Sequence, residues 1–245
     1  MKRKQLRIIP KLEIKNNNLI KTIFCEGLRV LGDPSEYAKK YYLEGADELL
    51  FLDNVATLME KKNVFDIIKT LTKDIFIPIT IGGGLRNLKD VELAFKSGAD
   101  KISLNTSATK NIKILKEINN IYGNQAIVMH IQTKLIDGTY YVFTDGGRQN
   151  SQIKLLDWIN SIQKIGIGEI VLTSIDREGT EKGYDIKLLK EVKDLIKVPL
   201  ILSGGFGKIE HIFECLKITS NINGFALASM LHYKIINLKK LKMLL

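Results

Sequence analysis

The sequence predicts a (β/α)8 TIM barrel, an α/β fold in which eight parallel strands alternate with helices. The main observation is an internal repeat, because residues 77–106 and 198–229 each contain a short strand, consecutive glycines and an amphipathic helix. Gly83 and Gly204 take the same place in the two copies and lie 121 positions apart (204 − 83). A supersecondary unit that is used twice is typical of a barrel built from two halves.

The repeat and the chain length together predict one domain. Glu48 and Glu169 are also 121 positions apart (169 − 48), so the repeat extends upstream of the glycines. We therefore expect two half-barrel repeats, at about 1–122 and 123–245. The 245 residues suit a single large α/β domain, and a hydrophobic content of 45% is enough for a barrel core.

Hydrophobic periodicity places the elements of the first half. Residues 7–14 form a strand whose period of two puts Arg7, Lys11 and Glu13 on the face that would point inward. We expect a long polar loop at 16–32. The further expected elements are a helix from 33 to about 44, a strand at 48–52, a helix at 64–73, a strand ending at the glycines, a helix after Asn87, a strand ending at 104 and a helix at 111–121.

The second half follows the same plan. A strand at 125–133 would turn Val128, His130 and Gln132 to one face, and Asp137-Gly138 signals a hairpin excursion at 134–143. The further expected elements are a helix at 155–164, a strand at 169–173, a loop at 174–180, a helix at 186–196, a strand at 200–203, a helix at 209–217, a strand at 224–228 and a short final helix.

The composition argues against several classes of protein. The net charge of +10 comes from lysines spread along the expected helices, so we expect no nucleic-acid binding, although such a charge favours anionic small ligands. Cys25 and Cys215 are too few and too far apart for a disulfide framework or a metal cluster, which favours a reducing cytoplasm. No apolar run has membrane length and no signal peptide is recognisable, so we expect no membrane contact.

The glycine runs are candidate anion sites. A strand that runs into Gly82, Gly83 and Gly84 cannot stay pleated, because residues without a Cβ readily adopt positive φ. The backbone N–H groups of such a turn suit an anion, most often a phosphate. The alternative is that the glycines serve only the geometry of the turn.

With these motifs in order, the chain resembles the cyclase subunit of imidazole glycerol phosphate synthase, a barrel of histidine biosynthesis that works with a glutaminase. The similarity covers nearly the whole chain through the segments RIIPKLEIK, GADELLFLD, IPITIGGGLRN, GADKISLNT, VFTDGGR, GEIVLTSIDREGT and SGG. Together these segments are highly specific, although GGG or SGG alone would be weak.

The resemblance implies a ligand with a phosphate at each end, and neither a cofactor nor a metal. One phosphate is expected on the loops after strands three and four, and the other on the loops after strands seven and eight. The phosphate-binding and substrate-binding positions carry over to Lys21, Asp53, Gly84, Asn105, Thr106, Thr173, Ser203, Gly204, Gly205 and Ser229.

The resemblance also implies a path for ammonia. In the family, ammonia enters the amino-terminal end of the barrel past four charged residues, which here are Arg7, Glu48, Lys101 and Glu169. Two pairs of opposite sign could satisfy one another there, and the alternative is a plug that merely fills the barrel bottom. Asp100 matches the family residue that meets the glutaminase, so a heterodimer with that partner is expected.

The match fails at the acid/base pair. The family uses an aspartate at the end of strand one and another at the end of strand five, where this chain has Glu13 and Gln132. The extra methylene of glutamate displaces its carboxylate by about 1 Å, which can cost about 10²-fold in rate. An amide neither gives nor accepts a proton near neutral pH, and losing a general acid or base typically costs about 10²–10⁴ in rate. Both changes argue against the standard cyclase reaction.

Lys11 and His130 stand where the family has small residues, in the layer beneath Glu13 and Gln132. Strand parity points both side chains into the barrel. One interpretation is an ion-paired network in which Lys11 offsets Glu13 or Asp53. The other is that His130, with a pKa near working pH, has taken over proton transfer.

These departures indicate a divergent paralogue of the kind found in surface-polysaccharide (lipopolysaccharide) gene clusters. The hypothesis is that the chain passes ammonia from a glutaminase to the amidination of a sugar, together with a separate amidotransferase. The first alternative is a functional cyclase of histidine biosynthesis that makes imidazole glycerol phosphate and AICAR. The second is a non-catalytic scaffold that activates the glutaminase.

Overall fold

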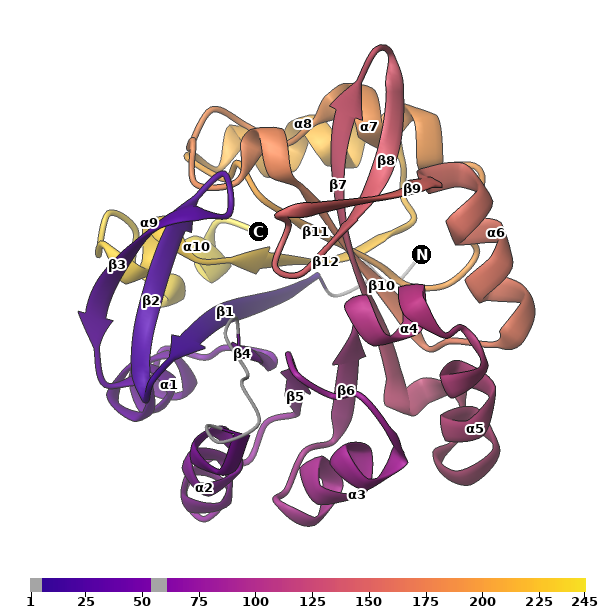
Figure 1. Ribbon diagram of the computed structural model, residues 1–245. Coiled ribbons are helices and arrows are strands. Elements are labelled where there is room, and N and C mark those ends of the chain that lie inside the picture. Colours follow the sequence, from indigo (N-terminus) through magenta and orange to yellow (C-terminus); the bar gives the residue numbers. More distant parts are fainter. Residues whose placement is uncertain (1–5, 54–60) are drawn as a thin grey trace.

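The computed structural model describes residues 6–53 and 61–245, and within them eight parallel strands close into a barrel (Figure 1). The barrel strands are β1 (Arg7–Lys15), β4 (Leu49–Asp53), β5 (Ile79–Gly82), β6 (Lys101–Leu104), β7 (Ile127–Ile136), β10 (Glu169–Ser174), β11 (Leu200–Ser203) and β12 (Ile222–Leu227). Each pairs in parallel with the next in this order, and β12 pairs with β1, so the eight barrel strands, as the structure describes them, form a closed sheet. The predicted (β/α)8 fold is confirmed.

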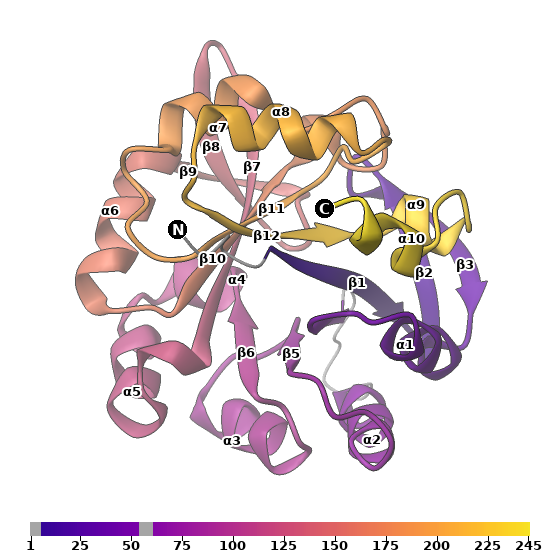
Figure 2. The ribbon, with the colours of Figure 1, turned by 180° about the vertical axis from the view of Figure 1, so that it is seen from behind.

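Helices surround the strands, as Figures 1 and 2 show from opposite sides. They are α1 (Pro34–Leu43), α2 (Lys61–Leu71), α3 (Leu88–Lys96), α4 (Thr106–Lys110), α5 (Lys113–Tyr122), α6 (Leu155–Ile165), α7 (Ile186–Val192), α8 (Glu210–Ile218), α9 (Ser229–His232) and α10 (Leu238–Met243), with 3-10 turns η1 (Asn124–Ala126) and η2 (Ile175–Arg177). Side chains cap several helix N-termini. Asp33 accepts a hydrogen bond from the Ser35 backbone N–H at 2.7 Å at the start of α1, and Asn87 accepts one from the Asp90 backbone N–H at 3.1 Å at the start of α3. The predicted helix at 186–196 is wrong at its end, because α7 stops at Val192.

The spacing of the sequence repeat recurs among the strands. The strands β5 and β11 begin 121 positions apart (200 − 79), and so do β6 and β12 (222 − 101). The first pair precedes the two glycine turns, and the second pair ends near Asn105 and Ser229. The division into two half-barrels at 1–122 and 123–245 stays a prediction about how the domain is organised.

The predicted polar loop at 16–32 is wrong, because this segment forms a β-hairpin of β2 (Asn18–Ile23) and β3 (Glu26–Gly32). Asn16 and Asn17 take positive φ values of 48° and 62°, and they turn β2 back against the end of β1. Asparagine tolerates this region better than most residues, because its short polar side chain can bond locally. The hairpin brings residues 24 and 25 over the carboxyl ends of the barrel strands.

The fifth loop contains the predicted hairpin, in which Asp137 and Gly138 connect β7 to β8 (Thr139–Thr144). Both turn residues have positive φ, as the tight turn requires. The sequence did not predict β9 (Gln149–Lys154), which extends the sheet beyond β8, nor the short helix α4.

Apolar residues fill two separate spaces. The larger core lies between the strands and the helices and includes Phe51, Trp158 and Phe225, each at most 4% exposed. Burying an apolar side chain of this size contributes roughly 1.5–3 kcal/mol. The smaller core lies inside the barrel and consists of Ile9, Leu50, Leu52, Val128, Val171, Ile201 and Ala226.

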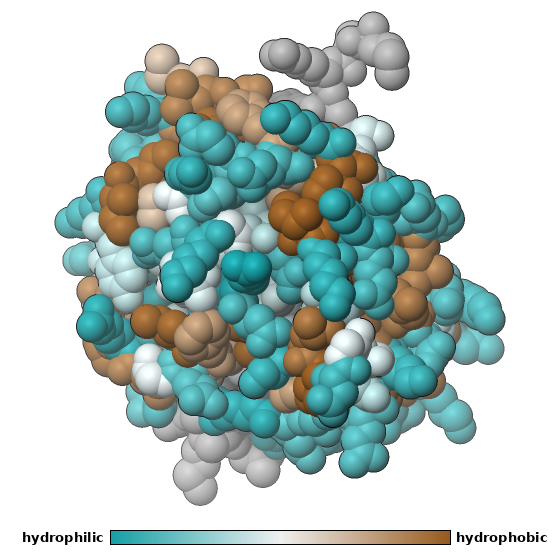
Figure 3. All heavy atoms as spheres, turned by 90° about the horizontal axis from the view of Figure 1, so that it is seen from above, coloured by the Kyte–Doolittle hydropathy of each residue, from teal (hydrophilic) through white to brown (hydrophobic). Residues whose placement is uncertain are grey.

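The face in Figure 3 mixes hydrophilic and hydrophobic clusters, with hydrophilic residues over much of it. None of the helices in the described part of the chain is both long and apolar enough to cross a membrane.

Candidate functional site

The inward side chains change character along the barrel axis. On β1 they are Arg7, Ile9, Lys11 and Glu13, from the amino-terminal to the carboxyl end of the strand, as the period of two predicts. Charged groups therefore lie at both ends, with the apolar interior core between them. In barrels of this kind, functional sites lie at the carboxyl ends of the strands.

A closed ring of ion pairs lies at the amino-terminal end. Arg7 bonds Glu48 at 2.9 Å and Glu169 at 2.6 Å, and Lys101 bonds the same two carboxylates at 2.7 and 2.6 Å. Every charge in this ring of four touches two of opposite sign. The hydroxyl of Thr80 also donates to Glu48 at 2.6 Å, a contact that strand parity on β5 could have predicted.

The ring favours the charged forms of Glu169 and Arg7. Burial alone would raise the pKa of Glu169, but Arg7 and Lys101 lower it below the ordinary value. Burial would lower the pKa of Arg7, and the two glutamates raise it instead. Asp100, the predicted partner contact, is exposed beside this ring and accepts from the Ile79 backbone N–H at 2.8 Å. Part of that carboxylate is thus occupied in fixing the start of β5.

A second charged cluster lies at the carboxyl ends, and it joins Lys11, Glu13, Lys21 and Glu178. The Nζ of Lys11 lies 3.2 Å from both Glu13 and Glu178, and Lys21 lies 2.7 Å from Glu178 and 3.9 Å from Glu13. All four side chains are at most 6% exposed. The predicted network around Lys11 is confirmed for Glu13, and Glu178 rather than Asp53 is its other anion.

This upper cluster contains two lysines and two glutamates, so its charges compensate. Burial would raise the pKa of Glu13, but Lys11 and Lys21 bring it below the ordinary value. The pKa of Glu178 is also lowered, because the same two lysines outweigh its burial. Sequence reasoning missed Glu178, which follows β10 in the SIDREGT segment. The signal that could have indicated it is the pair Lys11 and Lys21, on β1 and β2. Two buried lysines require buried anions nearby, and Glu13 alone supplies only one.

Gln132 is held by two polar neighbours. Asn105 Nδ2 donates to its Oε1 at 3.1 Å, and its Nε2 donates to Cys25 Sγ at 3.5 Å. Cys25 is at the tip of the β2–β3 hairpin, and a Cβ on Gly147 would lie 2.8 Å from its sulfur. Burial, Glu178 and Glu13 raise the pKa of this thiol to about 12. The hairpin tip therefore packs between the upper cluster and Gln132.

His130 points into the barrel, as predicted, but its predicted pKa is wrong. Its Nε2 lies 2.9 Å from Thr173 Oγ1, and the residue is 6% exposed. Burial and the nearby charge of Lys11 lower the pKa of His130 to about 4. The imidazole is therefore neutral near pH 7, so it is not a proton donor there, and its low pKa also makes it a weak proton acceptor.

A cavity of about 650 Å³ opens beside Gln132 and His130. Four predicted binding residues line it: Asp53, Gly84, Asn105 and Thr106. They come from the ends of β4, β5 and β6, so the fold brings them together. Thr106 accepts from the Asp145 backbone N–H at 2.9 Å, which ties the first residue of α4 to the turn after β8.

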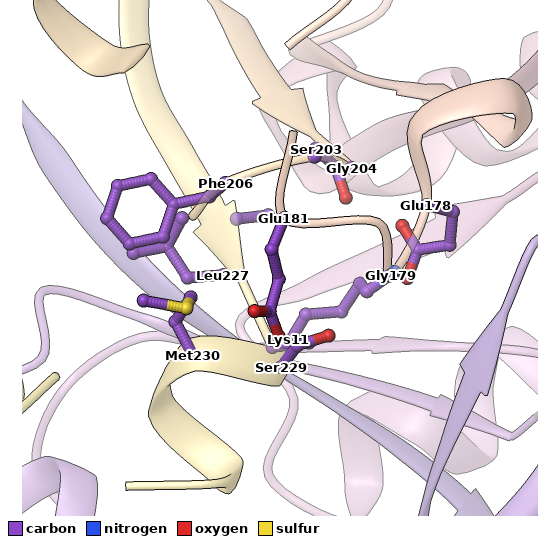
Figure 4. Close-up of a pocket in the computed structure, with 13 residues that line it drawn as sticks. Lys11, Glu178, Gly179, Glu181, Ser203, Gly204, Phe206, Leu227, Ser229 and Met230 are labelled. Atoms are coloured by element: carbon purple, nitrogen blue, oxygen red, sulfur yellow. Dashed lines mark hydrogen bonds and ion pairs between the residues drawn. The ribbon is translucent and has the colours of Figure 1, made fainter. Parts of the chain in front are cut away.

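The other predicted phosphate residues surround a much smaller cavity of about 20 Å³, which Figure 4 shows with Lys11 and Glu178 beside it. They are Ser203, Gly204, Gly205 and Ser229. Lys21 and Thr173 are not among the described residues that line either cavity. Lys21 instead donates to the Thr22 carbonyl at 2.6 Å and to Glu178. Within residues 6–53 and 61–245, no group of three or more His, Cys, Asp or Glu could hold a metal ion.

The fold and the site together define a (β/α)8 barrel with a charged ring at one end and a polar site at the other. The family described as "Histidine biosynthesis protein" has a sequence model that matches residues 7–237. The chain is 47% identical over 207 residues to imidazole glycerol phosphate synthase subunit HisF of Legionella pneumophila, which covers 84% of this chain and 98% of that protein. It is 42% identical over 236 residues to the subunit of the same name from Sulfurisphaera tokodaii, over 96% and 94% of the two chains. The chain belongs to the HisF family of imidazole glycerol phosphate synthase subunits.

Proposed function

We propose that this chain is the barrel subunit of a glutamine-dependent complex, and that it passes ammonia to an acceptor other than the histidine precursor. The observation that carries the proposal is the state of the two acid/base positions. Glu13 is paired with Lys11 at 3.2 Å, and Gln132 bears an amide that Asn105 and Cys25 hold in place. The amide does not exchange a proton near neutral pH, and the two lysines make the Glu13 carboxylate a weaker base.

The ring at the amino-terminal end supports the ammonia path. The resemblance assigns ammonia entry to these positions, and the exposed Asp100 is next to one of them. All four charges are paired in the closed ring, so passage requires at least one contact of Lys101 or Arg7 to break. We propose that a glutaminase subunit binds this end and shifts the ring. The apolar interior above it would then carry neutral ammonia rather than ammonium.

The cavity at the other end supports an anionic acceptor. It has a volume of about 650 Å³, within the range of small-molecule sites, and Arg86, Lys110 and Arg148 line it. A phosphorylated sugar that receives an amidino group during surface-polysaccharide synthesis fits this size and charge. In that role the chain would act together with a separate amidotransferase.

A second candidate is a working cyclase of histidine biosynthesis. It is favoured by the names of the relatives, because proteins 47% and 42% identical to this chain are described as imidazole glycerol phosphate synthase subunits. In that case Glu13 would serve as one acid/base group, and another group would replace Gln132.

Complementation tests the two candidates. The gene is expressed, with and without its glutaminase, in a strain that lacks the histidine cyclase, and glutamine hydrolysis by the purified pair is measured in parallel. We expect no growth without histidine, together with glutaminase activity that the barrel stimulates. Growth without histidine would contradict the proposal. If the barrel stimulates the glutaminase to the same extent whether or not a phosphorylated acceptor is added, the result would favour the non-catalytic scaffold.

A further inference from the structure

One ring nitrogen of His130 has no partner in the described part of the chain. The Nε2 of His130 lies 2.9 Å from the Thr173 hydroxyl, whereas no hydrogen bond to the Nδ1 is found among residues 6–53 and 61–245. The residue is 6% exposed, and it lines the cavity of about 650 Å³. A neutral imidazole carries its proton on one nitrogen, so an Nε2–H that donates to Thr173 leaves Nδ1 as a bare acceptor.

The side-chain amide of Asn105 provides a second acceptor. Asn105 Nδ2 donates to Gln132 Oε1 at 3.1 Å and to the Phe143 carbonyl at 2.9 Å, which uses both of its hydrogens. Because a backbone carbonyl can only accept, the bond to Phe143 fixes the orientation of this amide. The Oδ1 of Asn105 is buried and has no partner among the described residues. A buried acceptor of this kind is normally matched by a donor.

Strand register places these groups side by side. The strands β6 and β7 pair in parallel with Leu104 opposite Met129, so the next residues, Asn105 and His130, follow at the same level. Ser103 lies two positions before Asn105, and its buried hydroxyl also lacks a partner within the described ranges. All three residues line the large cavity. We call His130 Nδ1, Asn105 Oδ1 and Ser103 Oγ the acceptor cluster.

The acceptor cluster lies where the apolar interior of the barrel meets the large cavity. Leu52 belongs to the interior core and also lines this cavity. A Cβ on Gly82 would lie 2.7 Å from the Leu52 side chain and 2.7 Å from the Ser103 Cβ, so these two side chains meet at a glycine. A molecule that leaves the apolar core beside Leu52 therefore comes next to the hydroxyl of Ser103.

Other buried polar atoms without described partners differ in their surroundings. They include the hydroxyl of Ser203 and the Oε2 of Glu13. Ser203 lines the cavity of about 20 Å³ together with Lys11, whose ammonium group donates hydrogen bonds and does not accept them. The Oε2 of Glu13 is part of a charged carboxylate and lies 3.9 Å from the Nζ of Lys21. The acceptor cluster is instead uncharged, and it shares a cavity that has room for a small molecule.

We propose that His130, with its proton on Nε2, joins Asn105 and Ser103 in holding ammonia at the inner end of the large cavity. Ammonia has three N–H donors, one for each acceptor of the cluster, and its lone pair is then left for the molecule that receives it. All three acceptors are uncharged, which favours neutral ammonia over ammonium.

The inference rests on the proposed function for the supply of ammonia, and it gives His130 a binding role in place of proton transfer. The pKa of His130, lowered to about 4 by burial and Lys11, lets the imidazole accept a hydrogen bond from ammonia without becoming protonated. The cluster would therefore position ammonia beside the acceptor and leave its reactive form unchanged.

Nitrogen NMR of the full-length chain tests this inference, with ¹⁵N-labelled histidine, ammonium chloride as the probe and potassium chloride as the salt control. His130→Gln identifies the His130 signals among the three histidines. We expect a proton on Nε2 and none on Nδ1, and a shift of the Nδ1 signal that saturates as ammonium chloride is added at pH 9. At pH 8 less of the total is neutral ammonia, so the half-saturating total concentration should be about fivefold higher. Potassium chloride should cause no such shift.

Matched hydroxyl variants locate the ammonia. Ser103→Ala should raise the half-saturating concentration at least about threefold, because one hydrogen bond to the ligand is lost. Thr22→Val removes another buried hydroxyl that has no partner among the described residues, and it should change this concentration less than about twofold.

Five results would each overturn the inference: a proton on Nδ1, no saturable shift, equal half-saturation at the two pH values, an equal response to potassium chloride, or the same effect in Ser103→Ala and Thr22→Val. These titrations need neither a glutaminase nor an acceptor. Their failure is therefore distinct from failure of the proposed function, which complementation tests.

Discussion

The Nζ of Lys11 lies 3.2 Å from a carboxylate oxygen of Glu13, and both side chains are at most 6% exposed. The resemblance to the family implies that Glu13 stands where an aspartate exchanges protons. A carboxylate that two lysines hold in its ionised form is a weaker base, since their charges lower its pKa. The pairing ties Oε1 of Glu13 to the upper cluster, while its Oε2 is buried without a hydrogen-bond partner among the described residues.

The first prediction concerns the stability that Lys11 supplies. Lys11→Met should lower the free energy of unfolding by about 3–5 kcal/mol, because it leaves Glu13 and Glu178 with Lys21 as their remaining cation. Urea denaturation measures this loss. Lys96→Met is the matched control, since Lys96 is 69% exposed and pairs with Glu92 on the surface, where such pairs contribute little to stability. Equal losses in the two variants would contradict the account of the cluster.

The second prediction is a pH dependence that His130 causes. The folded state holds its pKa at about 4, and the unfolded value is about 6.5, so the unfolded chain binds a proton first as the pH falls. The contribution of His130 is present above pH 6.5 and is lost progressively as the pH falls toward 4. Between pH 6.5 and 4.5, wild type should lose about 2–3 kcal/mol more than His130→Gln. If the free energies of unfolding of wild type and His130→Gln change with pH in the same way, the folded state does not hold the imidazole neutral.

Much of the fold could be predicted from the sequence, because the repeat and the strand periodicity are local patterns. The parity of β1 placed Arg7, Lys11 and Glu13 inside the barrel, and the structure agrees. The β2–β3 hairpin could not be predicted in this way. Its outer strand is exposed along most of its length and lacks an alternating apolar pattern, and its turns use asparagines and Cys25 at positive φ rather than a glycine pair.

The site was predicted only in part, for a related reason. Positions on strands, such as those of the ring of ion pairs at the amino-terminal end, follow from parity and spacing. Glu178 lies in a loop, and its contact with Lys11 joins residues 167 positions apart, so nothing local indicates it. The pKa of His130 likewise depends on burial and on Lys11 from another strand, which the sequence does not specify.

The third prediction concerns the ring of four charged residues at the amino-terminal end of the barrel. Glu48 accepts from Arg7, Lys101 and Thr80, so Glu48→Gln leaves two cations with one carboxylate and should lower the free energy of unfolding by about 3 kcal/mol. Glu92→Gln is the matched control at an exposed pair and should change the free energy of unfolding far less than Glu48→Gln does. The difference is measured by urea denaturation. A ring variant as stable as the control would show that the four charges do not depend on one another.

The fourth prediction uses the thiol of Cys25 to report on the hairpin tip. Because the pKa of Cys25 is raised to about 12, almost no thiolate exists at pH 8. In a Cys215→Ser background, Cys25 should react with a disulfide reagent at least about 100-fold more slowly in the native chain than in denaturant. Rapid reaction of the native thiol would mean that the tip does not stay packed against Gln132 and Gly147.

Ring closure by the purified barrel and its glutaminase is the most direct measure of whether Glu13 and Gln132 have lost the cyclase chemistry. The complex receives glutamine and the histidine precursor, and both glutamate and imidazole glycerol phosphate are quantified. We predict that glutamate is released while imidazole glycerol phosphate does not rise above the level found with the glutaminase alone. Sustained formation of imidazole glycerol phosphate that Glu13→Gln abolishes would contradict the account.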